Sequence, residues 1–413
     1  MTDTKLSHCS FCGNHKDSVT KLIVGEDAAI CSDCVELCDS LIADDSAIVS
    51  KEEILYDPES IKAFLDDHII GQTQAKMVLS VAIANHYKRV NHPPKHLDIT
   101  KGNVLLIGPT GSGKTLLAKT VAKYLKVPFV VTDATSLTEA GYVGDDVESM
   151  ISMLLNAAGG DKALAERGIV FVDEIDKIAR KSEGSSITRD VSGEGVQQAL
   201  LKLVEGTVCR VPASGGRKHP GGDMVEVNTK NILFIGGGAF VGLKEIVDNR
   251  LNGTSIGFGA LIKDSHKDGD LTQVTPDDLT KFGMIPEFIG RFTTTVSVSN
   301  LTKEELVHVL TKVKNNYLEQ YQYLLSLDNI ALTFTDDAVE QLAENTMKLN
   351  TGARGLHTLI EQTLMPIMFK TKTLREAGVT KIIVCKSHVI DPGSLLTSIH
   401  PPNDLFLPPA SNE

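Results

Sequence analysis

The segment NVLLIGPTGSGKT, residues 103–115, sets the class of fold. An apolar run opens it, the pattern G-x-x-x-x-G-K-[ST] ends it, and the helix-forming stretch LLAKTVAKYL follows. A strand, a glycine-rich loop and a helix in this order form a phosphate-binding loop, because the glycines let backbone N–H groups and the helix N-terminus face the phosphates. The alternative is a glycine-rich turn that binds no ligand, but it does not explain why a strand precedes the glycines and a helix follows them.

Two side chains of the loop have predicted roles. Lys114 is expected to reach the β- and γ-phosphates, and the Thr115 hydroxyl is expected to ligate Mg²⁺. ATP with Mg²⁺ is therefore the expected ligand. The predicted nucleotide contacts in the loop are Gly108, Pro109, Thr110, Gly111, Ser112, Gly113, Lys114, Thr115 and Leu116.

An acidic pair follows a second apolar run. The residues IVFV, 169–172, precede Asp173 and Glu174. An aspartate at the end of a buried strand is able to hold the water shell of Mg²⁺, and the adjacent glutamate is able to polarise the attacking water. Two acids after a strand are otherwise helix caps. Beside a phosphate-binding loop, the pair predicts that the nucleotide is hydrolysed.

Strands and helices alternate around these motifs. The strand candidates are residues 103–107, 129–132, 168–172 and 231–235. The sequence after Asn300 is mostly helical, with helically spaced apolar residues at Leu306, Val309, Leu310 and Val313. We therefore predict an α/β fold with a parallel sheet, followed by a smaller, mainly helical domain. The expected division of the 413 residues is a zinc-binding domain at 1–50, a linker at 51–60, a large ATPase domain at 61–300, a small helical domain at 301–395 and a disordered tail at 396–413.

Four N-terminal cysteines have the spacing of metal ligands. Two residues separate Cys9 from Cys12 and Cys31 from Cys34, and eighteen residues lie between the two pairs. This spacing predicts a four-thiolate zinc site, and a module this small needs the metal to fold. Four unrelated buried cysteines are the alternative. The apolar helical stripe that follows leaves dimerisation or docking as a hypothesis for the module.

The composition disfavours several classes of protein. The net charge is −12, and residues 1–50 carry three lysines against nine acidic residues, which disfavours a DNA-reading zinc finger. No apolar run approaches the ~20 residues of a membrane span, and the polar start leaves no room for a signal peptide. We therefore expect a cytoplasmic protein without nucleic-acid or membrane partners, whose seven cysteines are reduced or bound to metal.

Together these motifs resemble the AAA+ ATPases. The resemblance rests on the phosphate-binding loop, the DEID segment at 173–176 and the GARG segment at 352–355. The cysteine module narrows it to the ClpX family, the Clp/Hsp100 unfoldases that partner the ClpP peptidase. The resemblance implies that HIIGQ, residues 68–72, lies against the adenine, with Ile69 and Ile70 as contacts. Without the phosphate-binding loop, the same residues would be read as a helix start with two core isoleucines.

The resemblance also implies roles for two arginines. Arg291, in PEFIGR, matches an arginine finger offered to the nucleotide of a neighbouring subunit, and Arg354 matches a sensor that contacts the phosphates of its own subunit. Both would stabilise charge on the transferring phosphoryl group, whereas either one alone would be an ordinary surface ion-pair residue. Thr293 stands where a proline is usual, so the loop is expected to be less rigid. The glycines at 236–238 replace a polar sensor, and no sensor is assigned there.

Three loops resemble the polypeptide-handling segments of the family. GYVG at 141–144 is similar to a pore loop whose aromatic ring grips an unfolded chain, GGRKHPGG at 215–222 to a basic loop at the pore mouth, and SIGFG at 255–259 to a peptidase-docking loop. The residues concerned are Tyr142 and Val143 in the pore, Arg217, Lys218 and His219 at its mouth, and Ile256, Gly257 and Phe258 for docking. The alternatives are an aromatic ring folded on its own domain, a solvated basic loop and local core packing.

The resemblance implies a hexameric, ATP-driven unfoldase and translocase that delivers tagged or unfolded proteins to ClpP, with adaptor proteins as candidate partners of the zinc domain. No serine or cysteine has a convincing triad context, so we predict no peptidase site. Two alternatives stay open. Acidic charge and the GYVG and IGF loops disfavour an AAA+ motor that acts on DNA, and the Asp173–Glu174 pair disfavours a chaperone that uses ATP only as a switch.

Overall fold

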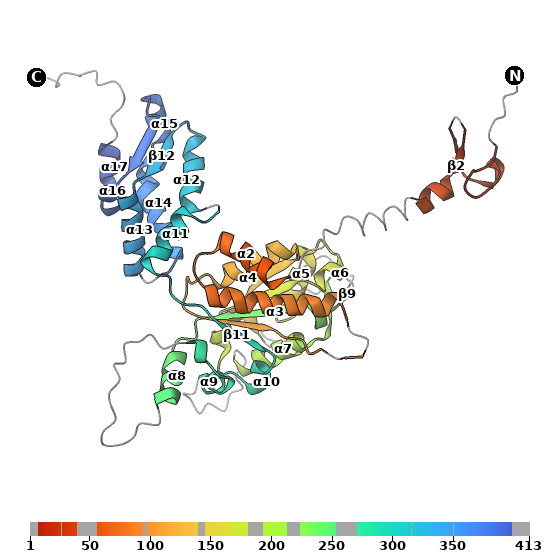
Figure 1. Ribbon diagram of the computed structural model, residues 1–413, viewed down its shortest axis with the longest axis horizontal. Coiled ribbons are helices and arrows are strands. Elements are labelled where there is room, and N and C mark those ends of the chain that lie inside the picture. Colours follow the sequence, from red (N-terminus) through yellow and green to blue (C-terminus); the bar gives the residue numbers. More distant parts are fainter. Residues whose placement is uncertain are drawn as a thin grey trace, which may run out of the picture. The chain divides into compact units, whose positions relative to one another are not determined.

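The computed structural model describes residues 7–25, 27–38, 56–93, 96–97, 99–138, 145–180, 193–212, 224–252, 271–314, 316–349 and 351–398 (Figure 1). The chain divides into two compact units, and the boundary lies between Leu55 and Tyr56. Within the described residues, no helix combines the length and the apolar character needed to cross a membrane.

The N-terminal unit is a small module built around its cysteines. Strands β1 (Leu22–Val24) and β2 (Ala29–Cys31) form an antiparallel pair, η1 (Lys16–Ser18) precedes them, and residues 32–38 are helical. The buried core consists of Cys9, Cys31 and Cys34, with three partly buried apolar side chains packed against it. So few apolar groups cannot offset the entropy of ordering the chain, which agrees with a need for metal.

A five-stranded parallel sheet organises the second unit, and the predicted α/β class is confirmed. The strands are β3 (Val104–Ile107), β4 (Phe129–Asp133), β7 (Ile169–Asp173), β10 (Leu233–Gly238) and β11 (Thr294–Ser297). They lie in the order β11-β3-β10-β7-β4, and every adjacent pair is parallel. Four of them match the predicted strands, whereas β11 was not predicted.

Every side chain of β3 is buried, although successive side chains of a strand point to opposite faces of the sheet. Both faces of the sheet are therefore covered, as in other parallel sheets with helices on each side. Helix α4 packs against β4, β7 and β10, α5 packs against β4 and β7, and α3 packs against β11. The helices of this part are α2 (Pro58–His68), α3 (Thr73–Asn91), α4 (Lys114–Leu125), α5 (Ser149–Ala157), α6 (Lys162–Ala165), α7 (Glu194–Glu205), α8 (Leu243–Asn252), α9 (Pro276–Phe282) and α10 (Pro286–Ile289). Its remaining elements are β5 (Leu137–Thr138), β6 (Asp145–Asp146), β8 (Val208–Pro212), β9 (Met224–Asn228), η2 (Ala134–Ser136), η3 (Ile175–Ile178), η4 (Thr229–Asn231) and η5 (Leu271–Gln273).

The C-terminal part is mainly helical and has a hydrophobic core of its own. Its elements are α11 (Lys303–Thr311), α12 (Tyr317–Ser326), β12 (Ala331–Phe334), α13 (Asp336–Leu349), α14 (Arg354–Phe369), α15 (Thr371–Glu376), β13 (Lys381–Val384), α16 (Lys386–Ile390) and α17 (Gly393–Thr397). The two strands form a parallel pair that the sequence did not predict. Leu306 and Leu310, two of the predicted apolar positions, are buried on α11.

Two predicted boundaries need correction. Helix α2 begins at Pro58, inside the segment 51–60 that was predicted to be a linker. The physical reason is an N-cap: the Asp57 side chain accepts a hydrogen bond from the Ser60 N–H, and the proline supplies the first-turn backbone angle. At the other end, α17 continues to Thr397, so the segment 396–413 is helical at its start.

Candidate functional site

The phosphate-binding loop joins β3 to α4, as predicted. The ammonium group of Lys114 lies 2.6 Å from the carbonyl oxygen of Gly108 and 2.9 Å from that of Pro109, and the Ser112 hydroxyl donates to the Pro109 carbonyl at 2.7 Å. Burial lowers the pKa of Lys114, although Asp173 and Asp176 oppose this shift. A phosphate carries more negative charge than a carbonyl, so it is able to displace these contacts and stabilise the ammonium form.

The loop also contacts the helical part of the same chain. The carbonyl oxygen of Gly111 accepts a hydrogen bond from the Ala353 N–H at 3.1 Å. A Cβ atom on Gly111, whose φ is +79°, would lie 2.2 Å from the carbonyl oxygen of Thr351, so only glycine fits this contact. Arg354 is the first residue of α14 and follows Ala353 directly. The structure thereby brings Arg354 next to the phosphate-binding loop of its own chain.

The acidic pair lies beside the loop hydroxyl. The hydroxyl of Thr115 donates to a carboxylate oxygen of Asp173 at 3.1 Å, although 58 positions separate them. A hydroxyl and a carboxylate in contact are suitable ligands for Mg²⁺ or its water shell. Glu174 is exposed and has a φ of +53°, a strained conformation for a residue with a side chain. Strain of this kind often occurs in active sites, and it agrees with the predicted role of Glu174.

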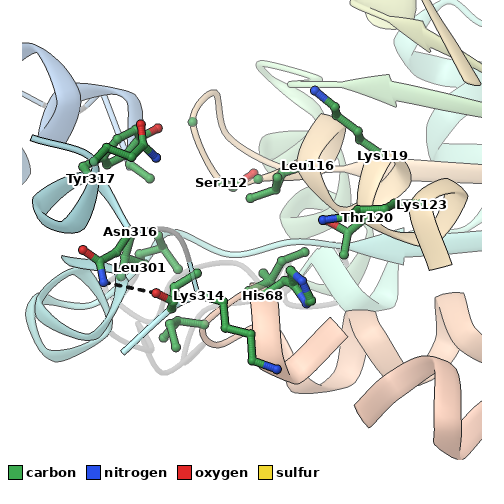
Figure 2. A pocket seen from close by; sticks show the side chains of 18 residues that line it. His68, Ser112, Leu116, Lys119, Thr120, Lys123, Leu301, Lys314, Asn316 and Tyr317 are labelled. Atoms are coloured by element: carbon green, nitrogen blue, oxygen red, sulfur yellow. Dashed lines mark hydrogen bonds between the residues drawn. The ribbon is translucent and has the colours of Figure 1, made fainter. Parts of the chain in front are cut away.

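A cavity of about 770 Å³ opens beside this loop (Figure 2). This size falls within the range of small-molecule sites. Leu116 and Tyr317 lie on opposite sides of the cavity, so α4 and the helical part both contribute to it. The lining residues are His68, Ile69, Ile70, Gly111, Ser112, Gly113, Leu116, Lys119, Thr120, Lys123, Leu301, Val309, Val313, Lys314, Asn316, Tyr317, Gln320 and Ala353.

The predicted adenine-side residues Ile69 and Ile70 both line this cavity, and a buried polar contact fixes the backbone at Ile69. The ammonium group of Lys76 donates to the carbonyl oxygen of Ile69 at 2.5 Å. The side-chain amide of Gln72 donates to the Ser299 carbonyl at 2.7 Å and accepts from the Ser299 N–H at 3.0 Å. These contacts join the segment at 68–72 to the connection between the sheet and the helical part.

Arg291 lies at the other end of the sheet from the phosphate-binding loop. Its carbonyl oxygen accepts a hydrogen bond from the Asn103 side chain at 2.9 Å, and Asn103 precedes β3 directly. The loop begins at Gly108, after β3, and the five extended residue steps from Asn103 to Gly108 span roughly 17 Å. The Arg291 guanidinium instead lies 2.6 Å from the Glu205 carboxylate. The structure therefore does not bring Arg291 to the nucleotide site of its own chain.

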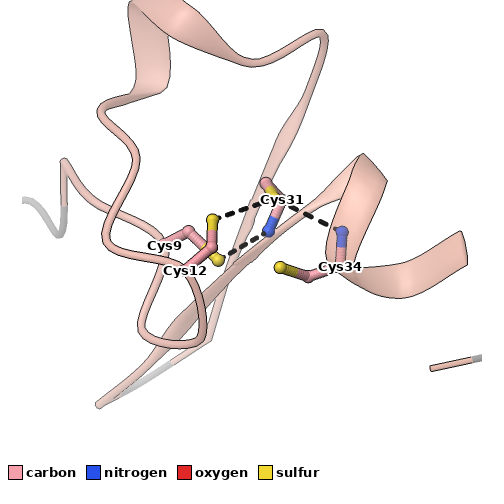
Figure 3. A group of neighbouring side chains, drawn as sticks. All are labelled: Cys9, Cys12, Cys31 and Cys34. Carbon is pink, nitrogen blue, oxygen red and sulfur yellow. Dashed lines mark hydrogen bonds between the residues drawn. The ribbon is translucent and has the colours of Figure 1, made fainter. Parts of the chain in front are cut away.

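The four N-terminal cysteines converge on one point (Figure 3). Their sulfur atoms all lie within 4.8 Å of one another, and those of Cys12 and Cys31 are 3.7 Å apart. Tetrahedral Zn–S bonds of ~2.3 Å place sulfur atoms ~3.8 Å apart, so this arrangement fits zinc. A backbone hydrogen bond from Cys12 lowers the pKa of the Cys9 thiol to about 6, whereas the contact with Cys31 raises the pKa of Cys34.

Three predicted loops lie outside the described residues. They contain Tyr142 and Val143 of the pore segment, Arg217, Lys218 and His219 of the basic segment, and Ile256, Gly257 and Phe258 of the docking segment. Their roles stay predictions.

Three family models match the chain. Residues 99–295 match an AAA domain (Cdc48 subfamily), residues 301–381 match the C-terminal, D2-small domain of ClpB protein, and residues 7–44 match the ClpX C4-type zinc finger. The ATP-dependent Clp protease ATP-binding subunit ClpX of Treponema denticola is 50% identical over 390 residues, which are 92% of this chain and 93% of that protein. The chain belongs to the ClpX family. This membership confirms the family predicted from the motifs, together with an ATPase fold that uses ATP, Mg²⁺ and zinc.

Part of the cavity lining of this ClpX-family chain became apparent only from the structure. The sequence did not predict the side that the helical part contributes, where Leu301, Val313 and Tyr317 lie. Val309 and Val313 were recognised only as apolar positions of a helix. A signal was present, because both belong to an apolar stripe directly after the last strand of the sheet, but only the fold shows that this stripe faces the loop.

Proposed function

We propose that this ClpX-family chain is an ATP-driven protein unfoldase and translocase that passes polypeptides to a separate peptidase. The observation that supports it most is the shared cavity: the phosphate-binding loop and Leu116 line one side, and Tyr317 of the helical part lines the other. A nucleotide there contacts two parts of the chain at once. Cleaving it changes the contacts of both, so hydrolysis is able to drive movement between them.

The chemistry assigned to the site is hydrolysis of the terminal phosphate of ATP. Lys114 and the N–H groups of the loop bind the phosphates, and Arg354 adds positive charge from the same chain. Thr115 and Asp173 would hold Mg²⁺, which supplies charge neutralisation to the phosphates when bound. Glu174 orients a water molecule and takes its proton as the water oxygen bonds to the γ-phosphorus. The bond from this phosphorus to the bridging oxygen breaks, which leaves ADP and phosphate.

The position of Arg291 supports a ring of several copies. About 17 Å of strand separates it from the phosphate-binding loop of its own chain, so a role at a γ-phosphate requires a neighbouring copy. We assign a homohexamer, in which Arg291 of one subunit completes the site of the next. Tyr142 and Val143 then face a central channel and grip the polypeptide, while Arg217, Lys218 and His219 attract its terminal carboxylate.

The peptidase partner in this proposal is ClpP. Ile256 and Phe258, on either side of Gly257, would fill apolar clefts on the peptidase ring, because exposed apolar side chains on a loop need a partner to cover them. The zinc module would recruit adaptors or substrates, and the proteins act in the cytoplasm. The relative in Treponema denticola is named as a subunit of an ATP-dependent Clp protease, which agrees with this partner.

One experiment tests the whole proposal. A stable fluorescent protein with a degradation tag is incubated with ATP and the purified chain, with and without ClpP, and the same is done with the Glu174→Gln variant. The parent should abolish fluorescence only with ATP, produce peptides only with ClpP, and lose both activities in the variant. Steady ATP turnover without loss of fluorescence would contradict the proposal, and stimulation of that turnover by DNA would favour a DNA motor instead.

A further inference from the structure

The side chain of Arg291 has a partner within its own chain. Its Nη2 atom lies 2.6 Å from a carboxylate oxygen of Glu205, the last residue of α7. The two residues are 86 positions apart, so the fold brings them together rather than the local sequence. We infer that Glu205 is a positioning residue that holds Arg291 in the orientation in which it meets the nucleotide of a neighbouring copy. This inference rests on the proposed role of Arg291.

The backbone of Arg291 is already fixed, which leaves the side chain as the variable part. Its N–H donates to the carbonyl oxygen of Phe288 at 3.0 Å, and its carbonyl oxygen accepts from Asn103 at 2.9 Å. Asn103 is buried, with 1% of its surface exposed. A long side chain on a fixed backbone still has many rotamers, and ordering it costs entropy. A carboxylate that orders it in advance lowers this cost at the moment of catalysis.

The geometry of the pair permits Arg291 to bind phosphate without leaving Glu205. A guanidinium has five N–H donors, and the contact with the carboxylate is made through Nη2. The other edge of the guanidinium remains able to form a bidentate contact with phosphate. The side chains of Arg291 and Glu205 are 46% and 40% exposed, so both are accessible to a neighbouring copy.

Helix α7, which carries Glu205, is held firmly at its other end. Gln197 is fully buried; its side-chain nitrogen donates to the Ile178 carbonyl at 2.7 Å, and its oxygen accepts from the Ile285 N–H at 2.8 Å. Ile178 ends η3, which follows the Asp173–Glu174 pair, and Ile285 precedes α10, which leads to Arg291. Helix α7, on which Glu205 lies, is therefore rigidly held and is connected through Gln197 to the hydrolysis site of its own chain.

The test compares Glu205→Gln with Arg291→Ala and with the double variant in steady-state ATP hydrolysis. Glu205→Gln should lower kcat about two- to fivefold, the upper part of the range expected for losing an exposed ion pair, with little change in KM. The double variant should hydrolyse ATP no more slowly than Arg291→Ala alone. Glu205→Asp, which keeps the charge, should retain more activity than Glu205→Gln.

The matched control is Glu226→Gln, which removes another exposed ion pair, with Arg210 at 2.8 Å. It should leave kcat unchanged, and thermal unfolding should be the same for all variants. An unchanged or raised kcat in Glu205→Gln would overturn the inference, as would an equal loss in the Arg291→Ala background. If Arg291→Ala itself turns over ATP like the parent, the proposed role of Arg291 fails. If Arg291→Ala loses ATP turnover but Glu205→Gln does not, only the role of Glu205 fails.

Discussion

The ammonium group of Lys76 lies 2.5 Å from the carbonyl oxygen of Ile69 and 2.8 Å from a carboxylate oxygen of Asp66. Its side chain is only 3% exposed. Since Ile69 lines the cavity beside the phosphate-binding loop, this lysine fixes the backbone at the side proposed to bind the adenine. Lys76→Met keeps the length but leaves a buried carbonyl without its donor, a loss of roughly 1–2 kcal/mol. We expect about tenfold weaker ATP binding, measured by titration in the Glu174→Gln background.

Lys62→Met is the control for this prediction. The ammonium group of Lys62 lies 2.6 Å from the other carboxylate oxygen of Asp66, but the side chain is 32% exposed and lies outside the cavity lining. This variant should bind ATP like the parent. Equal weakening in both variants would assign the effect to Asp66 and would remove the role of Lys76.

The phosphate side of the site could be predicted from the sequence because its chemistry is local. The loop that contains Lys114 is a continuous segment between β3 and a helix, and Asp173 ends β7, a parallel strand of the same sheet that only β10 separates from β3. Carboxyl ends of parallel strands meet at one edge of a sheet, so the contact between Thr115 and Asp173 follows from these two segments. The zinc site was predictable for a similar reason, since paired cysteines in tight turns direct their sulfur atoms to one point.

The other side of the cavity could not be predicted, because it depends on how the helical part folds back. Tyr317 and Leu301 carry no local pattern that marks a ligand contact, and the pairing of Glu205 with Arg291 joins two distant segments. Strand β11 was missed because it is an edge strand with the sequence TTVS, in which a single side chain is buried. The start of α2 had a signal at Asp57, but a cap is informative only when the helix after it is recognised.

A mixing experiment tests whether Arg291 acts on a neighbouring copy. Arg291→Ala subunits keep the Asp173–Glu174 site, and Glu174→Gln subunits keep the arginine. Each variant alone should hydrolyse ATP at least about a hundredfold more slowly than the parent. In an equal mixture, about a quarter of the interfaces join an intact site to an intact arginine, so turnover should recover well above either variant.

The control mixture combines Glu174→Gln with a chain that carries both substitutions. It contains no intact hydrolysis site, so it should stay inactive. If the first mixture also stays inactive while rings form, Arg291 does not act across the interface. Recovery in both mixtures would mean that Glu174 is dispensable.

The aromatic ring of Tyr142 is expected to transmit the movement that ATP hydrolysis drives to the bound polypeptide. Tyr142→Ala removes the contact with the polypeptide but none of the groups at the nucleotide, so ATP turnover should persist while unfolding of a stable tagged protein falls about tenfold or more. Tyr142→Phe keeps the ring and should unfold the same protein at close to the parent rate. Equal unfolding by all three proteins would place this ring outside the channel.

Deleting residues 256–258 should separate docking from unfolding. These residues would contact only the peptidase, so ATP turnover and loss of substrate fluorescence should match the parent. Peptide production with ClpP should fall to the background without the chain. Retained degradation by the deletion variant would show that Ile256 and Phe258 do not dock the peptidase.

Removing zinc should unfold the N-terminal module and leave the second unit intact. The buried core of the module consists of three of the four cysteines, so the metal supplies most of what holds residues 7–38 together. A chelator, or Cys31→Ser, should make this segment sensitive to protease, and readdition of Zn²⁺ should reverse the effect of the chelator. Protection of residues 56–398 and the rate of ATP turnover should not change. Persistent protection of the module after complete metal removal would contradict the structural role.

The buried ring of His86 should make the ATPase domain less stable in mild acid. Its Nε2 atom lies 3.0 Å from the carbonyl oxygen of Asn231, and burial, with the positive charges of Arg89 and Lys101, lowers its pKa to about 3. The unfolded chain binds a proton near pH 6.5, whereas the folded chain does not until about pH 3. Stability from this residue is thus complete above pH 6.5 and falls by about 1.4 kcal/mol for each pH unit below it. Urea unfolding at about pH 7.5 and about pH 5 should differ by about 2 kcal/mol from this source, and His86→Gln should lose that difference. His357→Gln, in which a half-exposed ring is replaced, should keep it; equal pH dependence in the parent and His86→Gln would show that the proton is taken up elsewhere.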